Sequence, residues 1–460
     1  MDCLFCTTAG SSRGRTANER SVRTSYTGKK RRRGCLMTAD IQLTNVLVYR
    51  NGSFQPGTVT VENGLITSVT EANGASPKKL LVPGGIDIHV HFNEPGRTDW
   101  EGIANGSKAL AAGGMTAFAD MPLNSSPPTA TAERVLEKKR LFKEKSRIHG
   151  SCWGALLPGH VDDLEAMKAA GIIGVKAFMS PSGLDEFASA GEELLLEGMT
   201  RMAELDLILA VHAESPAVLQ RYQNECGSYR EFAASRPPEA EREAVSSLLS
   251  YAAKTGCAVH ICHVTCAEAL EEIRRAKRHG VHVTAETCPH YLFFTGTEAE
   301  TKGTLAKCAP PIRGKRHQDA LWEALLDGTL DLVSSDHSPA PPAMKDVPFR
   351  DAWGGIAGGQ HTWHVLLTEG KRRGIAVETM VPWVTRAPAE RFRLENPVEI
   401  APGNPADMAL LDPDVEWTMT REDARHRHPE SIYTGARFTG RVEKTWVHGE
   451  EIAGAGVPSV

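Results

Sequence analysis

Eight short apolar segments alternate with amphipathic helical segments along the middle of the chain, which predicts an α/β fold built on a (β/α)8 TIM-like barrel. Eight such units in about 250 residues match the usual size of this barrel. Strand-like segments with Asn-Gly turns lie at the two ends of the chain and predict a small composite β-sandwich domain. A doubly wound sheet is the alternative, but no Gly-rich dinucleotide fingerprint supports it.

The eight predicted barrel strands are short segments rich in apolar residues, as expected of parallel strands buried on both faces. They lie at residues 86–91, 115–120, 148–153, 172–178, 207–212, 259–263, 281–286 and 330–336. The helices between them carry apolar residues three and four positions apart. The clearest examples lie at residues 130–145, 161–170, 239–255 and 267–279.

The predicted domains follow from where these patterns begin and end. Residues 1–36 are expected to form a disordered basic extension, because they lack periodicity and hold nine Lys or Arg against two acids. Residues 37–82 and 395–460 are expected to form the two parts of the β-sandwich, since neither part alone can enclose a core. Residues 83–394 are expected to form the metal-dependent barrel. The basic run at 29–33 could be a targeting or nucleic-acid patch, but a solvated tail, or sequence upstream of a start at Met37, is favoured.

Composition excludes several classes of function. The net charge is −5, and because the first 36 residues carry +7 the remainder carries −12, which argues against a nucleic-acid partner. No run approaches 18 apolar residues, so a membrane span is not expected. The ten cysteines show no zinc-ribbon spacing, and several lie in apolar runs. This pattern predicts reduced thiols and a cytoplasmic location.

His89 and His91 stand two residues apart at the end of the first predicted barrel strand. Side chains two apart on a strand face the same side, so both imidazoles project from the carboxyl end, where barrels place their chemistry. Two converging imidazoles can hold one edge of a divalent metal ion. A single His-x-His triplet is a weak signal, because such histidines also serve as hydrogen-bonding groups.

Four more residues occupy the ends of later predicted strands, namely Lys176, His212, His263 and Asp336. A lysine ammonium would repel a cation, but a lysine that has reacted with carbon dioxide is an anion whose two oxygens can bridge two metals. Each residue alone has a structural explanation, as a strand-end lysine, a helix-capping aspartate or hydrogen-bonded core histidines. The occurrence of all six at strand ends favours a binuclear metal site.

The segments around these six positions resemble the cyclic amidohydrolase family, which comprises dihydroorotases, hydantoinases, dihydropyrimidinases and allantoinases. The resemblance runs from about Ile41 to Glu450. It rests on five motifs: His89-Val90-His91, Gly174-Val175-Lys176-Ala177-Phe178, Val211-His212-Ala213-Glu214, Cys262-His263-Val264 and Ser335-Asp336-His337-Ser338.

The resemblance implies a (β/α)8 barrel with two divalent metal ions per subunit, zinc first, with cobalt, manganese or iron as alternatives. It implies that His89, His91 and Asp336 hold one ion and that His212 and His263 hold the other. Lys176, as N6-carboxylysine, would bridge the two ions, and Asp336 would also be the catalytic proton acceptor. A homo-oligomer, specifically a homotetramer, is expected as well.

Within this family, the segments 93–102, 120–125, 303–313 and 352–358 are most similar to the allantoinase branch. The implied reaction is hydrolysis of the cyclic amide of allantoin to allantoate, in purine and ureide catabolism. Dihydroorotases typically carry Arg where the uncharged Asn93 stands, and hydantoinases and dihydropyrimidinases typically carry Tyr where Pro181 stands. Ala340 is a departure, because some allantoinases have Cys at that position.

Backbone groups around Ala309 and the loop Gly354-Gly355 are expected to orient the substrate ring, together with Asn93. Two other functions are kept as alternatives. The chain could be a hydantoinase or dihydropyrimidinase that acts on a related cyclic ureide. It could also be a non-enzymatic scaffold paralogue of the same fold, although such proteins have lost metal ligands and all six ligand positions are filled here.

Overall fold

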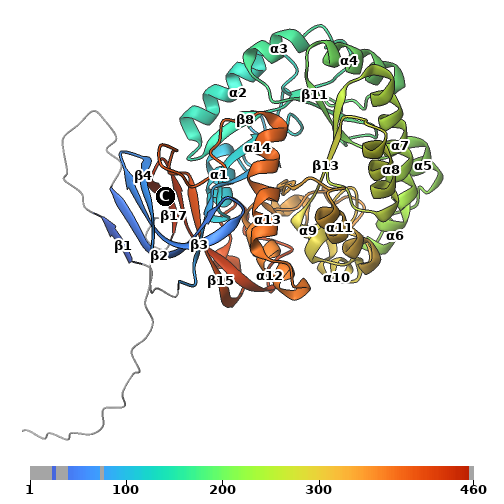
Figure 1. Ribbon diagram of the computed structural model, residues 1–460. Helices are drawn as coiled ribbons and strands as arrows, with labels where there is room; N and C mark the ends of the chain where they lie inside the picture. The colour runs from blue at the N-terminus through green and yellow to red at the C-terminus, as the bar shows by residue number, and fades with distance from the viewer. Residues whose placement is uncertain (1–22, 27–39, 73–76, 455–460) are drawn as a thin grey trace, which may run out of the picture.

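Parallel strands form the centre of the protein, and helices cover their outer side (Figure 1). The computed structural model describes residues 23–26, 40–72 and 77–454. The central strands are β6 (Gly85–Val90), β7 (Met115–Asp120), β8 (His149–Cys152), β9 (Gly154–Ala155), β10 (Val175–Phe178), β11 (Ile208–His212), β12 (Ala258–Ile261), β13 (Val283–Thr287) and β14 (Leu332–Val333). All eight predicted strands are therefore present in the predicted order, and the short β9 is an addition.

The central strands pair in parallel in two sheets, with the orders β14-β13-β12-β11-β10-β9 and β6-β7-β8. The sheets adjoin at two places. Only Trp153 separates β8 from β9 along the chain, and a parallel bridge joins Val90 at the end of β6 to His337 beyond β14. His91 N donates to His337 O at 2.8 Å beside that bridge, so the ends of the first and last central strands are tied together.

Some of the helices begin or end at a residue that supplies a cap. In α2 the Thr131 side chain accepts from Arg134 N, and α7 ends at Gly256 in the left-handed conformation. The helices are α1 (Ile103–Ala112), α2 (Ala132–Lys145), α3 (Leu164–Ala170), α4 (Glu192–Glu204), α5 (Pro216–Arg221), α6 (Tyr229–Ser235), α7 (Pro238–Thr255), α8 (Ala267–Arg278), α9 (Pro289–Phe293), α10 (Gly296–Lys302), α11 (Lys315–Asp327), α12 (Thr362–Arg373), α13 (Val377–Val384) and α14 (Arg386–Phe392).

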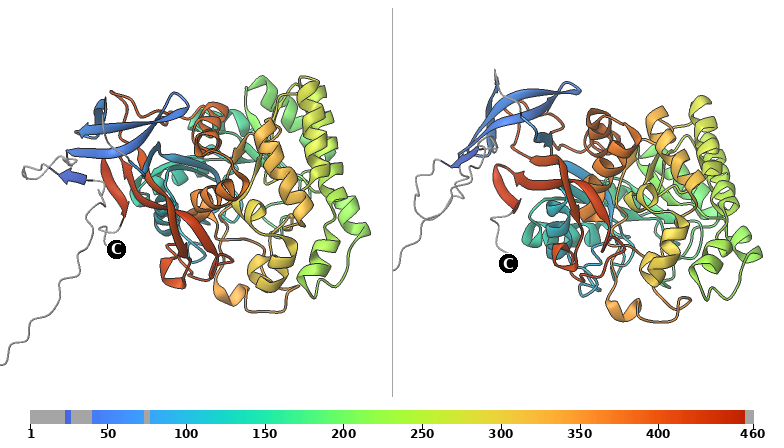
Figure 2. Two further views of the ribbon diagram at one scale, coloured as in Figure 1. Left: turned by 60° about the horizontal axis from the view of Figure 1, so that its bottom comes forward. Right: turned by 90° about the horizontal axis from the view of Figure 1, so that it is seen from below.

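Strands from both ends of the chain lie side by side at one flank of the central body (Figure 2). They are β1 (Arg23–Tyr26), β2 (Ile41–Arg50), β3 (Ser53–Glu62), β4 (Leu65–Glu71), β5 (Leu80–Pro83), β15 (Met408–Thr418), β16 (Arg437–Val447) and β17 (Glu450–Gly454). Apolar side chains from the two ends share one buried cluster, in which Leu43 and Val59 from the N-terminal strands lie with Met408 and Trp446 from the C-terminal ones. The burial of this shared cluster holds the two ends together.

Two expectations about these ends differ from the structure. The strands form one eight-stranded sheet, whereas a sandwich was predicted, because β5 pairs with β2 on one side and with β15 on the other. Residues 1–36 were predicted to be disordered, which is wrong for Arg23–Tyr26. These residues form β1, which pairs antiparallel with residues 41–44 of β2 and so satisfies backbone groups of that strand. The rest of 1–36 lies outside the described residues.

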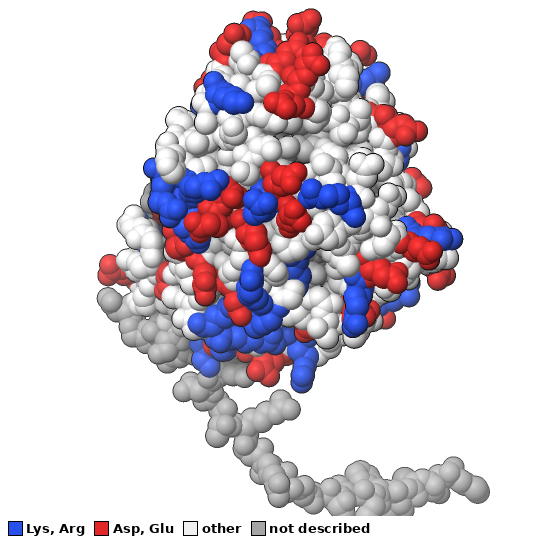
Figure 3. All heavy atoms as spheres, turned by 90° about the vertical axis from the view of Figure 1, so that its right-hand side faces the viewer, with Lys and Arg blue, Asp and Glu red and all other residues white. Residues whose placement is uncertain are grey.

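The charge pattern of the surface and the length and polarity of the helices relate to the expectations about nucleic-acid and membrane partners. Basic and acidic side chains are intermingled on the face shown in Figure 3. Many of them form ion pairs, for example Arg274 with Asp327 at 2.9 Å. Within the three described ranges, the helices are too short or too polar to cross a membrane. The seven cysteines in those ranges are free thiols, as the sequence predicted.

Candidate metal centre

The six predicted ligands converge at the carboxyl ends of the central strands. His89 lies in β6 and His91 directly follows it, Lys176 lies in β10, and His212 ends β11. His263 and Asp336 follow the ends of β12 and β14 by two and three residues. All six side chains are buried or nearly so, and Lys176 is fully buried. The structure thus brings together groups that are up to 247 positions apart in the chain.

Asp336 is shared by two imidazoles on one side of the cluster. Its Oδ1 lies 3.4 Å from His89 Nε2 and 3.2 Å from His91 Nε2. On the other side, His212 Nδ1 lies 3.1 Å from His263 Nε2. The two sides are in contact, because ligand atoms of His89, His263 and Asp336 all lie within 4.8 Å of one another. Two imidazoles and a carboxylate at these separations form a donor set that suits a divalent metal such as zinc.

In three of the imidazoles, the ring nitrogen that points away from the cluster, here called the outer nitrogen, contacts another residue. His89 Nδ1 contacts Glu286 Oε1, His91 Nδ1 lies 3.3 Å from the Leu123 carbonyl, and His212 Nε2 lies 2.8 Å from Glu214 Oε2. Since carboxylates and carbonyls accept, these outer nitrogens carry the protons. The inner nitrogens then present lone pairs to the cluster. Second-layer contacts of this kind are typical of histidines that bind metals.

Electrostatics keep three of the imidazoles neutral, which metal binding requires. Burial lowers the pKa of His89, His212 and His263 below the usual value, and the nearby charge of Lys176 lowers each of them further. Burial alone would raise the pKa of Asp336, but the adjacent His89 and His91 outweigh it and hold that pKa well below its usual range. Asp336 is therefore a carboxylate at neutral pH.

Lys176 lies inside the cluster without a carboxylate partner among the described residues. Its Nζ donates to Cys262 Sγ at 3.0 Å and lies 5.2 Å from the centre of the Phe178 ring. A buried ammonium that faces a thiol and a ring is poorly compensated, because the desolvation of its charge is costly. The same position, between the His89–His91 side and the His212–His263 side of the cluster, suits a carbamate. Its negative charge would compensate the positive charge of bound metal ions.

Three residues of this site have a strained backbone conformation. Asn93, His263 and Asp336 have φ values of 62°, 39° and 47°, in the left-handed region that residues other than glycine seldom adopt. Such conformations cost on the order of 1–3 kcal/mol each and persist where the surrounding structure holds them. Here they aim three polar side chains from strand ends into one small volume.

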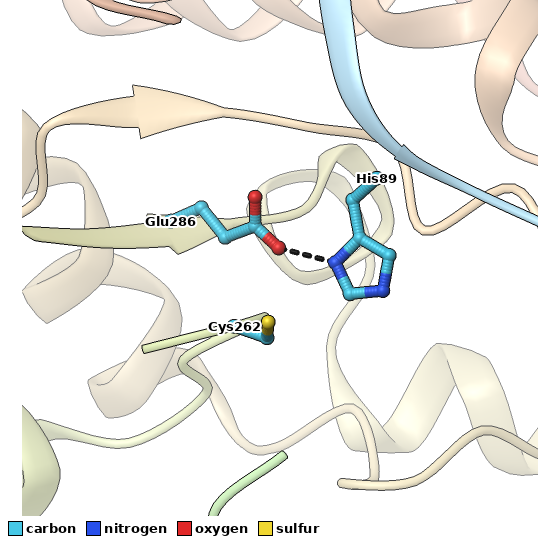
Figure 4. A group of neighbouring side chains, drawn as sticks. All are labelled: His89, Cys262 and Glu286. Carbon is cyan, nitrogen blue, oxygen red and sulfur yellow. Dashed lines mark hydrogen bonds and ion pairs between the residues drawn. The ribbon is translucent and has the colours of Figure 1, made fainter. Parts of the chain in front are cut away.

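Sequence reasoning missed three carboxylates that support the cluster. Glu286 contacts His89 (Figure 4). Its other carboxylate oxygen lies 3.3 Å from His260 Nε2. Glu214 holds His212, and Asp87 Oδ1 accepts from the backbone N–H groups of His89 and Ser335. Glu286 stands at the end of the predicted strand 281–286, so the strand-end criterion that found the ligands applied to it as well.

Cys262 forms a second possible donor group with His89 and Glu286 (Figure 4). That group is less suited to a metal. Burial raises the pKa of the Cys262 thiol to about 12, and the nitrogen of His89 that faces Glu286 already contacts its carboxylate. Only a thiolate binds metals strongly, so the group with His263 and Asp336 fits better.

The predicted substrate-side residues contact the segments that follow Asp336 and precede Ala309. The Asn93 amide lies 3.5 Å from the Pro339 carbonyl, and its buried Oδ1 has no partner in the structure. Gly355 N donates to Lys307 O at 2.8 Å, which ties the Gly354-Gly355 loop to the segment that leads to Ala309. A Cβ atom at Gly355 would lie 2.2 Å from Ser338 O, so only glycine allows this loop to approach the segment after Asp336.

A buried lysine that the sequence did not suggest anchors the same loop. Lys345 Nζ donates to the carbonyls of Trp353 and Gly355 at 2.8 Å and to that of Thr304 at 3.3 Å. Burial lowers the pKa of Lys345 to about 7. The ammonium thus cross-links both loops that border the site.

Comparisons with known proteins agree with this geometry. Residues 80–452 match the amidohydrolase family. An allantoinase from Bacillus velezensis is 40% identical over 427 residues, which cover 90% of this chain and 94% of the relative, and one from Deinococcus radiodurans is 45% identical over 380 residues, which cover 81% and 84%. Among solved structures, L-hydantoinase from Arthrobacter aurescens superposes with a TM-score of 0.85 at 26% identity and covers 91% of this chain and 96% of its own.

Proposed function

Because this chain belongs to the amidohydrolase family, we propose that it hydrolyses the cyclic amide of allantoin and releases allantoate. The observation that carries the substrate assignment is the extent of its likeness to allantoinases, which spans most of both chains. The neutral, unpartnered Oδ1 of Asn93 supports it, because allantoin carries no carboxylate that would need an arginine.

The donor set and the family together imply a divalent metal centre, and the proposal assigns its ligands. His89, His91 and Asp336 would hold one ion, His212 and His263 the other, and carboxylated Lys176 would lie between them. Zinc is the first choice, since imidazole and carboxylate donors suit it, with cobalt, manganese or iron as substitutes. Such ions supply Lewis acidity for the attack of water on the ring carbonyl.

Asp336 would move the proton in this reaction. Its carboxylate stays ionised at neutral pH, so it can accept a proton as water adds to the carbonyl carbon. The ring C–N bond then breaks, and Asp336 returns the proton to the leaving nitrogen. The products are a carboxylate and a free ureido group on one open chain. Asn93 and the backbone around Ala309, Gly354 and Gly355 would orient the ring for this attack.

Three features of the assembly belong to the proposal as well. The two parallel sheets would close into one (β/α)8 barrel, which the Val90–His337 bridge and the short break at Trp153 favour. The free cysteines favour a reducing compartment, the cytoplasm. A homotetramer is expected from the family resemblance alone, and sedimentation would test it.

A substrate panel tests the proposal against the hydantoinase alternative. The protein would be reconstituted with zinc and bicarbonate, and ring opening would be measured on allantoin, hydantoin, dihydrouracil and dihydroorotate. Allantoin should give the highest kcat/KM. A higher value for hydantoin or dihydrouracil would reassign the chain to that branch, and purified protein without metal or activity on any ring would support the scaffold alternative.

A further inference from the structure

A third cluster of metal-ligand side chains lies far from the catalytic end. Within residues 23–26, 40–72 and 77–454, three groups of His, Cys, Asp or Glu bring their ligand atoms within 4.8 Å of one another. Two of the groups share His89. The third consists of His149, Asp407 and His448, and none of these three residues takes part in the proposed reaction.

The three residues come from three separate elements. His149 is the first residue of β8, at the end of the strand opposite to the one that carries the catalytic groups. Asp407 directly precedes β15, and His448 lies in the turn between β16 and β17. The cluster therefore spans the contact between the parallel strands and the sheet built from the chain ends.

The geometry of this cluster matches a site for a cation. His149 Nε2 lies 2.8 Å from Asp407 Oδ2, and the centres of the His149 and His448 rings are 5.2 Å apart. The Asp407 side chain is 1% exposed, so it is a fixed anion, whereas the two rings are accessible enough to rotate toward it. Two imidazoles and one carboxylate are a ligand set that proteins use for zinc, with water as the fourth ligand.

An open hollow of about 700 Å³ adjoins the cluster, and His149, Asp407 and His448 are part of its lining. Three cationic side chains also line it, but each is engaged elsewhere. Lys139 donates to Ala170 O and Lys168 to Leu205 O, while Arg393 pairs with Asp206. Of these three, only Arg393 is paired with a carboxylate, and the two lysine ammonium groups are directed at backbone carbonyls. The hollow gives a hydrated ion a path to the imidazoles.

We propose that His149, Asp407 and His448 form a second metal site, which takes a zinc-type divalent cation and clamps the end-strand sheet to the start of β8. The ion would take the place of the proton between His149 Nε2 and Asp407 Oδ2, and His448 would complete the protein ligands. An ion that binds only the folded chain stabilises it by mass action, so this site should make stability depend on zinc.

Metal content and thermal stability test the site in the holoenzyme. Wild type and His448→Asn would be equilibrated with the same micromolar free zinc and washed identically. Asparagine tolerates the left-handed backbone at position 448, where φ is 47°, so the fold should persist. The wild type should retain about one more zinc ion per chain than the variant, and its Tm should rise more with added zinc. Allantoin turnover should be equal in both.

A matched control separates this site from ordinary surface histidines. His160 pairs with Asp163 at 2.8 Å and has the same exposure as His149, but it belongs to none of the three donor groups. His160→Asn should keep the wild-type zinc content, and His149→Gln should lose the extra ion as His448→Asn does. Equal zinc content and equal zinc-dependent Tm in wild type and His448→Asn would overturn the proposal, whatever the number of ions at the catalytic end.

Discussion

The Glu286 carboxylate contacts Nδ1 of His89, and the opposite nitrogen of the same ring faces Asp336 at 3.4 Å. A buried acceptor on one side of the ring thus fixes which nitrogen is free on the other side. The second Glu286 oxygen lies 3.3 Å from His260 Nε2, so the carboxylate is itself held in place. His89 is therefore oriented before any ion binds.

Replacement of Glu286 by Met should weaken metal binding, because Met fills the space but cannot accept from His89. Loss of such a second-layer partner costs about 10- to 100-fold in metal affinity. Glu286→Gln keeps an acceptor and should lose less. Competition with a zinc chelator measures both affinities. Unchanged affinity in Glu286→Met, with the fold intact by circular dichroism, would show that Glu286 does not position His89.

Asn93 is expected to contact the substrate through its unpartnered amide oxygen. Asn93→Gly and Asn93→Ala should both lower kcat/KM for allantoin by about tenfold, the value of one hydrogen bond of about 1.4 kcal/mol. Only Asn93→Ala should also lower Tm, because the φ of 62° is unstrained for glycine but costs alanine about 1 kcal/mol. Wild-type kcat/KM in Asn93→Gly would exclude the contact.

Lys345 should make stability depend on pH. Burial lowers its pKa to about 7 from the ordinary 10.5, so the unfolded chain holds a proton between these values that the folded chain has released. Stability then rises with pH across this window, by about 1.4 kcal/mol per pH unit. Below pH 7 Lys345 is charged in the folded as well as the unfolded protein, so the folded state carries the full free-energy cost of the buried charge.

The comparison with Lys345→Met isolates this contribution, since all other titrating groups cancel. The Tm of wild type minus that of the variant should increase from pH 7 to pH 9. A difference that stays constant or falls over this range would mean that Lys345 keeps its ordinary pKa in the folded protein.

Removal of the first 36 residues should leave activity intact. A chain that begins at Met37 lacks β1, but β2 still pairs with β3 and β5. The expected result is a wild-type kcat/KM and a Tm that is lower by a few degrees, because the loss of about 1 kcal/mol shifts the Tm of a large domain only slightly. A collapse of kcat/KM would show that the N-terminal residues support the site.

The central strands and the six polar side chains at their ends could be predicted because the signals are local. A buried parallel strand is a continuous apolar run, and the polar residue that ends it is visible in the same segment, as at His212 and Asp336. Glu286 also ends such a segment and could be found as a strand-end residue, but its contact with His89 could not be predicted in this way. Its partner His89 lies 197 positions away, and their contact depends on which strands face each other.

The structure of the chain ends also depends on distant pairing. β1 carries no strong periodic pattern, and its strand is defined by the partner β2. The single end sheet follows from the two-sided pairing of β5, which no local pattern specifies. The anchoring role of Lys345 could not be predicted for the same reason, because its three carbonyl partners lie on two loops that meet only in the folded protein.

Metal content and turnover of Lys176→Ala test most directly whether a two-metal centre bridged by this lysine opens the ring. Four neutral imidazoles and one carboxylate cannot hold two dications close together without a further anion, because their repulsion is uncompensated. The variant should therefore lose at least one ion per chain, and its turnover of allantoin should fall by orders of magnitude. High concentrations of a short carboxylic acid should restore part of the turnover. Two retained ions per chain with near wild-type turnover and no added acid would contradict the bridge.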